Sequence, residues 1–420
     1  MNNSATIKID LDKTLFVLFC CYAFSLPFEL FFEVLFGIET IFKPFRIFSI
    51  IIIGIFGIKT ITKGIQFDPA NRIDFFLYGA YLYGLFISMI RMVEVVFSMG
   101  LFFNDLFQLV FFLGNFFIFK TLPFSISRIH TILHYFIAGI CLNSLYSFWT
   151  VLQGIELGRN AGFSDNPNYF ALGILAAIVF FILKFNYPLK FKTKISIGFL
   201  LLFLFNMFGV AGSRGALVSL FIAVLLVFII SNFYKKITLI FLATVASLFF
   251  LFNNLSSVVS DSSFTLIHRV SKSLSSESSD DSPRFVIWKG VFRTLEDQGY
   301  AGLGIGQFKA NFVKYYGEES NGIILDMVNR GYYLSPHNDY LYLLTDYGLP
   351  SLILYLIFLI LQVSRLGRIL NRVVQGEKEH FLIRFNFIIL IGLIIFGLTT
   401  DSLIHPLFWF LLMFITKKNI

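Results

Sequence analysis

Charge is scarce in this sequence. Asp, Glu, Lys and Arg together make up 14% of its 420 residues, whereas soluble domains carry about 25%. Apolar residues make up 57%, Phe alone occupies 57 positions, and the mean hydropathy is +0.79. A soluble fold cannot bury that much apolar surface without aggregating. The composition therefore excludes a soluble enzyme, a disordered tail and a nucleic-acid-binding module, and it predicts a polytopic membrane protein.

The sequence also lacks the alternation of apolar and polar residues that marks the strands of membrane barrels. Its apolar runs are continuous, which is typical of membrane-spanning helices. We therefore expect an all-α polytopic membrane protein with about twelve transmembrane helices. The expected spans are residues 14–35, 41–58, 73–90, 103–120, 128–150, 167–184, 193–210, 214–231, 236–253, 337–362, 381–399 and 401–416.

Cysteine is rare as well. Cys20, Cys21 and Cys141 all lie in apolar runs, two of them are adjacent, and no CxxC spacing exists. This pattern excludes a disulfide framework and a thiolate metal site, and it predicts small buried hydrophobic residues. His130 and His134 share a helix face but have no carboxylate near them in the sequence. We therefore expect no metal site and no other cofactor.

The basic residues are distributed unevenly among the connections between the expected spans. If the N-terminus is cytoplasmic, one set of connections carries 20 of the 33 Lys and Arg residues, the opposite short connections carry five, and the long loop carries eight. Cytoplasmic connections of membrane proteins are enriched in Lys and Arg. The first apolar run lacks an A-x-A cleavage site, so it is expected to stay as a helix. Both termini are thus expected in the cytoplasm, with the long loop outside.

The long loop divides the expected chain into three parts. Residues 1–253 hold the first nine spans, residues 254–336 form the outer loop, and residues 337–420 hold the last three. The loop begins with a Ser-rich, flexible stretch over 271–282. An amphipathic helix is expected from Pro283, with Phe285, Trp288, Phe292 and Leu295 on one face, and another over 307–316. Gly302, Gly304 and Gly306 between them are expected to form a tight turn.

A few polar residues stand at the expected outer edge of the membrane, where charge is costly and usually functional. Arg214 occupies a very short turn between two apolar runs, beside Gly212 and Gly215. His337 opens the tenth span. Arg284 stands in the first turn of a loop helix, where backbone N–H groups also favour anions. Two guanidiniums suit a pyrophosphate, and a neutral His suits deprotonation of a hydroxyl.

Each of these signals has a structural alternative. An Arg at a helix end can reach the interface as a mere anchor, and a lone His is often a structural or capping residue. Asn168, in an Asn-Pro turn, and Asp401, between the last two spans, are weak candidates individually. His130, His134, His268, His380 and His405 lack comparable polar neighbours in the sequence. What distinguishes the set is its placement: distant parts of the chain supply polar residues to the same expected face.

Several motifs, in this order around one long loop, resemble those of the bacterial O-antigen ligase and O-antigen polymerase superfamily. The resemblance covers about residues 170 to 400 and, before that, the number of spans only. The motifs are Asn166-Pro-Asn168-Tyr169-Phe-Ala171, Ser213-Arg214-Gly215, Arg284 with Trp288, Gly302-x-Gly304-x-Gly306-x-Phe308, His337-Asn338-Asp339-Tyr340-Leu341 and Asp346-Tyr-Gly348-Leu-Pro350.

The resemblance implies a glycosyltransferase of the inner membrane that moves a glycan from undecaprenyl pyrophosphate to a hydroxyl on the periplasmic side, without a metal or nucleotide sugar. It implies that Arg214 and Arg284 bind the pyrophosphate and that His337 activates the acceptor. Supporting roles are expected for Asn168, Asn338, Asp339, Asp401, Trp288 and Gly304.

The resemblance leaves the acceptor open. A polymerase uses a sugar hydroxyl of another lipid-linked repeat unit, and a ligase uses the lipid A core. The high Phe and Ile content favours a strain-specific polysaccharide polymerase, for which a chain-length regulator is a candidate partner. A transporter or flippase is the main non-enzyme alternative, although no repeated halves with matching broken helices are present in the sequence. A structural or sensor membrane protein would not require both arginines and His337 on one side.

Overall fold

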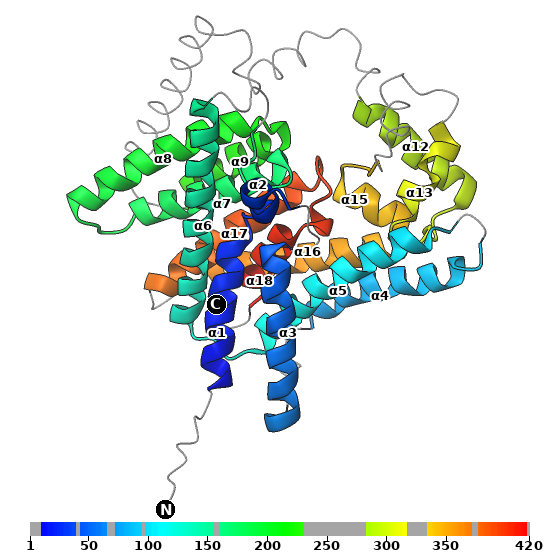
Figure 1. Ribbon diagram of the computed structural model, residues 1–420, viewed down its shortest axis with the longest axis horizontal. Coiled ribbons are helices and arrows are strands. Elements are labelled where there is room, and N and C mark those ends of the chain that lie inside the picture. Colours follow the sequence, from blue (N-terminus) through cyan, green and yellow to red (C-terminus); the bar gives the residue numbers. More distant parts are fainter. Residues whose placement is uncertain are drawn as a thin grey trace, which may run out of the picture.

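The computed structural model describes residues 10–38, 43–64, 72–94, 97–153, 160–230, 283–316, 334–371 and 377–417. Every regular element in these ranges is a helix (Figure 1), which confirms the expected all-α class. Seven of the described helices are long and apolar enough to cross a membrane, so the chain is a polytopic membrane protein. They are α3 (Pro44–Lys63), α5 (Met99–Thr121), α6 (Ile126–Leu152), α7 (Pro167–Phe185), α8 (Phe191–Ala211), α16 (Leu349–Leu370) and α17 (Glu377–Phe396).

The expected number of twelve spans is not confirmed by these residues. The ninth expected span, 236–253, lies outside the described ranges. Four further apolar segments form shorter helices: α1 (Leu11–Ser25), α4 (Asp74–Arg91), α9 (Arg214–Ile230) and α18 (Pro406–Thr416). The 11 residues of α18 rise about 16 Å at 1.5 Å per residue, roughly half of a hydrocarbon core.

Two expected spans are interrupted, and each interruption has a local cause. The first ends early because Pro27 follows α1, and a short α2 (Phe31–Phe36) comes after the turn. The tenth consists of α15 (Asp339–Tyr342), a π-helical turn over Leu343–Tyr347, and α16. Gly348 between them has φ 88°, and a Cβ there would lie 2.2 Å from the carbonyl oxygen of Ala301. Only glycine fits at this junction.

Contacts between connections fall into two groups, which match the two expected sides of the membrane. Expected cytoplasmic connections contact one another, and expected outer connections contact one another. The first group includes Lys59 with Asp12 at 2.5 Å, Lys378 with Ser127 at 3.3 Å, and Lys417 with the Leu122 carbonyl at 2.5 Å. The second includes Lys43 with Asp165 at 2.7 Å, the Ser98 N–H with Gln307 at 2.7 Å, and Trp288 with the Pro336 carbonyl at 3.0 Å.

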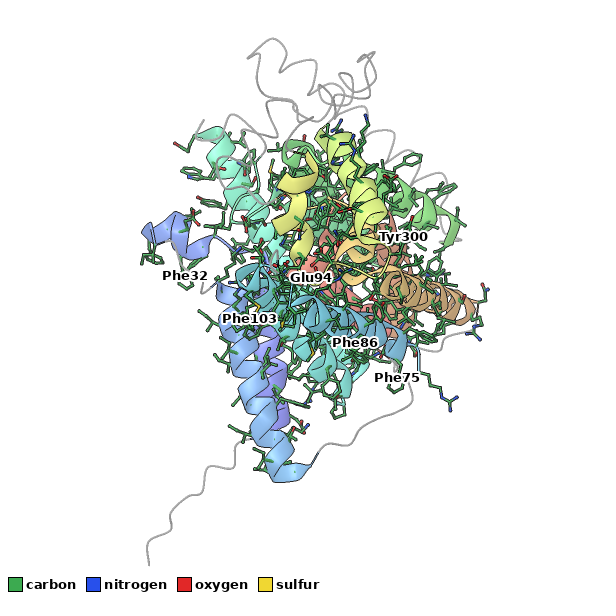
Figure 2. All side chains as sticks on the ribbon, turned by 90° about the vertical axis from the view of Figure 1, so that its right-hand side faces the viewer. Phe32, Phe75, Phe86, Glu94, Phe103 and Tyr300 are labelled. Carbon is green, nitrogen blue, oxygen red and sulfur yellow. The ribbon has the colours of Figure 1, made fainter. Side chains whose placement is uncertain are left out.

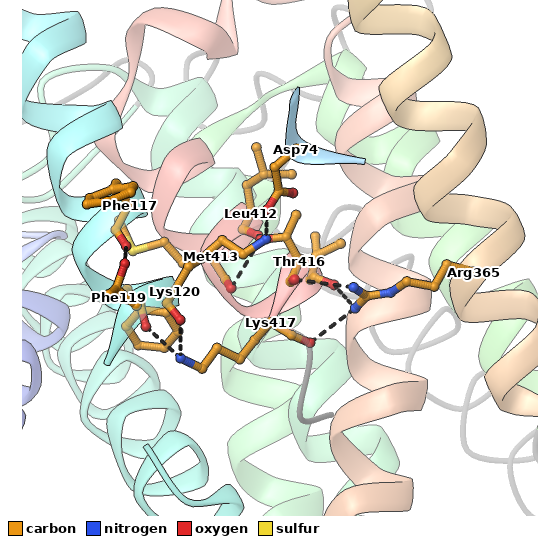
Figure 3. A network of polar contacts seen from close by, with 11 residues as sticks. Asp74, Phe117, Phe119, Lys120, Arg365, Leu412, Met413, Thr416 and Lys417 are labelled. Carbon is orange, nitrogen blue, oxygen red and sulfur yellow. Dashed lines mark hydrogen bonds and ion pairs between the residues drawn. The ribbon is translucent and has the colours of Figure 1, made fainter. Parts of the chain in front are cut away.

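A polar network joins the helices at the end of the bundle where the expected cytoplasmic connections meet (Figure 3). The Nζ of Lys417 donates to the carbonyl oxygens of Phe119 and Lys120, both at 2.8 Å, and so satisfies the open end of α5. Arg365 of α16 donates in the same way to the carbonyl oxygens at the end of α18, at 3.1 to 3.3 Å. Lys120 also pairs with Asp74. The last turn of α18 is therefore anchored to two neighbouring helices.

The sides of the bundle carry exposed aromatic residues (Figure 2). Phe75 and Phe86 of α4 are 64% and 58% exposed, and Phe103 of α5 is 56% exposed. Such exposure is costly in water, but it matches a surrounding of lipid chains.

The two expected loop helices are present. They are α12 (Pro283–Gln298) and α13 (Gln307–Tyr316), and the three glycines form the turn between them with positive φ. The expected apolar face of α12 is wrong at Phe292, which is 54% exposed. The side chain of Phe285 lies outside the described part. The face that packs against α13 consists of Ile287, Val291 and Leu295. The Ser-rich stretch 271–282 lies outside the described residues.

The π-helical turn holds the loop helices against the transmembrane part. The buried carboxylate of Asp346 accepts hydrogen bonds from the backbone N–H groups of Gly306 at 3.0 Å and Phe308 at 2.7 Å. Lys309 pairs with Asp105 of α5 at 2.9 Å. The start of α13 is thus fixed to two membrane helices, and α12 packs on α13.

Candidate active site

His337 and Asp401 form a histidine–carboxylate pair. Nδ1 of His337 lies 3.0 Å from Oδ1 of Asp401, and the His337 side chain is 41% exposed while that of Asp401 is 6% exposed. An ionised carboxylate only accepts hydrogen bonds, so the ring proton of a neutral His337 lies on Nδ1. Its Nε2 then carries the lone pair. Within the described part of the chain, Asp401 is the hydrogen-bond partner of this ring, and the arrangement is that of an oriented general base.

Asp401 itself is held on three sides, in the turn after α17 and outside the spanning helices. The Ser335 hydroxyl donates to its second carboxylate oxygen, and the Tyr169 hydroxyl donates to its backbone carbonyl at 3.0 Å. Burial alone would raise the pKa of Asp401, but the hydrogen bonds from His337 and Ser335 outweigh it and lower that pKa. Asp401 therefore stays ionised at neutral pH.

The backbone at His337 is strained. Among the described residues that are not glycine, it alone has a positive φ, 49°. Such conformations persist only when the surroundings impose them, and they are common at functional sites. Trp288 of α12 fixes the preceding residue by donating to the Pro336 carbonyl at 3.0 Å. Asn338 fixes the following turn, because its side chain caps α15 and donates to the Leu398 carbonyl at 2.9 Å.

Asp339 joins the segment of His337 to that of Asp401. Its buried carboxylate accepts hydrogen bonds from the Ser402 hydroxyl and from the Leu403 N–H at 2.9 Å, and its own N–H donates to the Gly397 carbonyl at 2.7 Å. A Cβ on Gly397 would lie 2.5 Å from Oδ2 of Asp339. The structure thus brings Asn338, Asp339 and Asp401 together around His337.

Arg214 stands at the first position of α9, half-buried, just after the left-handed Gly212 that ends α8. The next residue, Gly215, packs directly on the turn that carries Asp401. A Cβ on Gly215 would lie 1.8 Å from Oγ1 of Thr399. The glycine therefore allows the start of α9 to approach this turn closely.

Arg284 lies on the loop helix that contacts the segment of His337. It occupies the first turn of α12, half-buried, four residues before Trp288. Residues four apart lie on the same face of a helix, and Trp288 contacts Pro336, the neighbour of His337. The helices that carry Arg214 and Arg284 thus each contact one of the two segments that form the histidine–carboxylate pair, through Gly215 and Trp288 respectively.

Of the remaining expected site residues, Asn168 lies near the His337–Asp401 pair and Gly304 does not. Asn168 lies in the first turn of α7, beside Tyr169, whose hydroxyl contacts Asp401. Gly304 lies in a different place from the pair: a Cβ there would be 3.2 Å from the Cα of Ser88, at the end of α4. The structure therefore associates Gly304 with the docking of the loop helices.

A second histidine–carboxylate pair escaped sequence analysis. The expectation that His405 lacks polar neighbours is wrong, because its Nε2 lies 3.1 Å from Oε1 of Glu29. Glu29 lies in the turn between α1 and α2. Burial would raise the pKa of this carboxyl, but His405 above all, with Lys43 and the Asp165 N–H, lowers it to about 2. The sequence signal for this pair is the carboxylate of Glu29 inside an apolar run. The sequence does not show its partner, because His405 lies near the opposite end of the chain.

Comparison with known proteins bears on the segment of the chain that carries both arginines. Residues 197–356 match the family model described as O-antigen ligase. No curated protein matches the chain. The matched segment includes Arg214, Arg284, Trp288 and His337, while Glu29, Tyr169 and Asp401 lie outside it. The match spans 160 of the 420 residues, and over this segment the chain is similar to the O-antigen ligase and O-antigen polymerase superfamily.

Proposed function

We propose that the protein is a glycosyltransferase that moves a glycan from undecaprenyl pyrophosphate to a sugar hydroxyl of another lipid-linked repeat unit, and so polymerises a surface polysaccharide. The family match supports an enzyme of this class. The observation that carries the proposal is the His337–Asp401 pair, which provides an oriented base beside two helices whose first turns hold Arg214 and Arg284.

The proposed reaction is a single displacement. The acceptor hydroxyl attacks the anomeric carbon of the donor while Nε2 of His337 accepts the hydroxyl proton, and Asp401 stabilises the resulting imidazolium. The bond between the anomeric carbon and the pyrophosphate oxygen breaks, and its electron pair leaves with the lipid pyrophosphate. Arg214 and Arg284 stabilise the charge that develops there. One displacement inverts the anomeric centre, and the step uses no metal and no covalent sugar–enzyme intermediate.

The proposed placement is the inner membrane, with about twelve spans, both termini in the cytoplasm and the reaction on the periplasmic face. The bias of 20 basic residues to five supports this orientation. The grouping of the connections at two ends of the bundle supports it independently, because no sequence rule forces those contacts.

A ligase that transfers the glycan to the lipid A core is the second candidate, because the matching family model is described as O-antigen ligase. The lipopolysaccharide ladder of a deletion strain separates the two. A core that carries one repeat unit indicates a polymerase. A bare core with lipid-linked long polymer left behind indicates a ligase. An unaltered ladder contradicts both and favours a transporter of another glycan.

The catalytic role of His337 is tested with purified protein and lipid-linked donor and acceptor. His337→Ala is expected to lower turnover roughly 10²–10⁴-fold, the usual contribution of a general base, while donor binding survives because both arginines remain. His380→Ala is the matched control, since His380 lies near the start of α17, at the opposite end of that helix from Asp401. Excess EDTA is expected to leave turnover unchanged. Equal turnover of the two variants would exclude His337 as the base.

A further inference from the structure

The second histidine–carboxylate pair lies one contact away from the first. His405 is the residue before α18, and the backbone N–H of Leu407 donates to its Nδ1 at 3.3 Å. Nδ1 is therefore an acceptor, and a ring proton resides on Nε2. That nitrogen is buried and lies 3.1 Å from Glu29 Oε1, at ion-pair distance but without a well-aligned hydrogen bond. Glu29 thus faces the proton-bearing side of the ring.

Tyr169 connects this pair to Asp401. Its ring stacks on the imidazole of His405, with the ring centroids 3.6 Å apart and the planes at 21°. Its hydroxyl donates to the Asp401 carbonyl at 3.0 Å. The position of the tyrosine is therefore set by His405 on one side, and its hydroxyl fixes the main chain of Asp401 on the other.

Glu29 fixes this assembly from a third direction. Its Oε2 accepts a hydrogen bond from the Asp165 N–H at 3.1 Å, in the loop that leads into α7 and Tyr169. The same turn is joined to that loop by the Leu30 N–H, which donates to the Phe163 carbonyl at 2.8 Å. One buried carboxylate therefore contacts the start of α18 and the segment that carries Tyr169.

We propose that Glu29 is a positioning residue for the transfer reaction, acting through His405 and Tyr169 on the main chain of Asp401 and so on the orientation of His337. The inference rests on the proposed function, because it assumes that His337 is the base. It assigns a role in catalysis to the first part of the chain, which the family match does not reach. Small displacements of a base are costly because proton transfer requires close alignment with the hydroxyl.

The test compares Glu29→Gln with Glu33→Gln in purified, folded protein. Glu33 is an exposed carboxylate on the adjacent α2, so its variant controls for loss of one charge near the same turn. Glu29→Gln is expected to lower kcat about 10-fold and to change the KM for the donor less than about twofold, since the proposed pyrophosphate contacts remain. Glu33→Gln is expected to match the wild type in both constants.

Tyr169→Phe provides a second route, because it removes one hydroxyl and keeps the stacked ring. It is expected to lower kcat roughly 3–10-fold, the value of one lost hydrogen bond. If Glu29 acts through Tyr169, the double variant loses no more than the more damaged single variant. Multiplying effects would show that the two residues act separately and would overturn the proposal.

Two other results count against the proposal. A Glu29→Gln protein that folds in lower yield but keeps its kcat per folded molecule shows a purely structural role. A Glu29→Gln protein with unchanged kcat and a raised donor KM shows a binding role instead. Failure of the proposed function is recognised separately: His337→Ala would then keep full turnover, whatever the Glu29 variants do.

Discussion

The Nδ1 of His337 lies 3.0 Å from the Oδ1 of Asp401, although 64 positions separate the two residues in the chain. One follows the long outer loop and the other follows α17, and the carboxylate of Asp339 joins the two segments. The exposed histidine is thus oriented by a buried, ionised partner.

Asp401→Asn is expected to lower kcat by roughly 10²–10⁴-fold with little change in donor KM. The amide removes the charge that stabilises the imidazolium, and its NH₂ group can favour the other tautomer, in which Nε2 is no longer an acceptor. Steady-state kinetics of the purified variant measure this. Glu377→Gln, at the exposed start of α17, is the control and should leave kcat unchanged. A similar small effect of both substitutions would show that Asp401 does not orient the base.

Arg214→Lys and Arg284→Lys are each expected to lose at least about 10-fold in kcat/KM for the donor. An ammonium keeps the charge but cannot make the two parallel hydrogen bonds of a guanidinium to a pyrophosphate. Arg368→Lys is the matched control, because Arg368 lies in the last turn of α16, at the end of that helix far from His337. Normal activity of Arg214→Lys would mean that this residue is only an interfacial anchor.

Gly215→Ala is expected to lower both stability and activity. A Cβ would lie 1.8 Å from Oγ1 of Thr399 and 2.8 Å from its Cβ, and overpacking of this kind costs about 1–3 kcal/mol. Combining it with Thr399→Ala removes the closer overlap and should restore part of the loss. The thermal unfolding midpoint and kcat report the two effects. A single variant that equals the wild type in both would contradict the close approach of α9 to this turn.

Acid is expected to remove the contribution of Glu29 to stability. Its pKa in the folded protein is about 2, below the value of about 4.3 for an unfolded Glu. A lowered pKa stabilises the fold above the unfolded value, and the stabilisation is lost as the pH falls toward the folded value. The unfolding midpoints of the wild type and Glu29→Gln should therefore differ most above about pH 5 and converge as the pH falls below about 4. A gap that widens in acid would contradict the assigned direction of the shift.

Orientation in the membrane is tested with a reporter that is active only in the periplasm. Fusion after Ser276 should give an active reporter, and fusion after Gln375 a silent one, because the basic residues cluster on the second side. The reverse result would place the His337–Asp401 pair on the cytoplasmic face and remove the lipid-linked donor from its reach.

The sequence predicts the helices of this fold well because apolar runs and local start signals determine them. The Ser-Pro pair before α12 and the Gly-rich turn before α13 are examples, and both helices begin where expected. The interruptions at Pro27 and Gly348 were missed because the surrounding residues are apolar enough to continue a span. The buried face of α12 was assigned incorrectly for a similar reason: the helix carries apolar residues on more than one side, and only packing against α13 selects Ile287, Val291 and Leu295.

Some residues of the candidate site can be identified from the sequence, and others only from the structure. His337, Asn338 and Asp339 are adjacent in sequence, so one motif identifies all three. Asp401 was a weak candidate until the structure placed it against His337. Glu29 and His405 could not be paired from sequence, because their contact joins the two ends of the chain and each stands alone in an apolar run.

In the proposed reaction, His337, oriented by Asp401, drives a direct displacement on a lipid-linked glycan. The most direct measurement is the anomeric configuration of the new linkage, determined by NMR on the product that the purified protein makes from a lipid-linked donor of known configuration. A single displacement requires a product whose new linkage is inverted relative to the donor, and His337→Ala should form that product roughly 10²–10⁴-fold more slowly. A product that retains the donor configuration, or one formed equally well by His337→Ala, would contradict the proposed reaction.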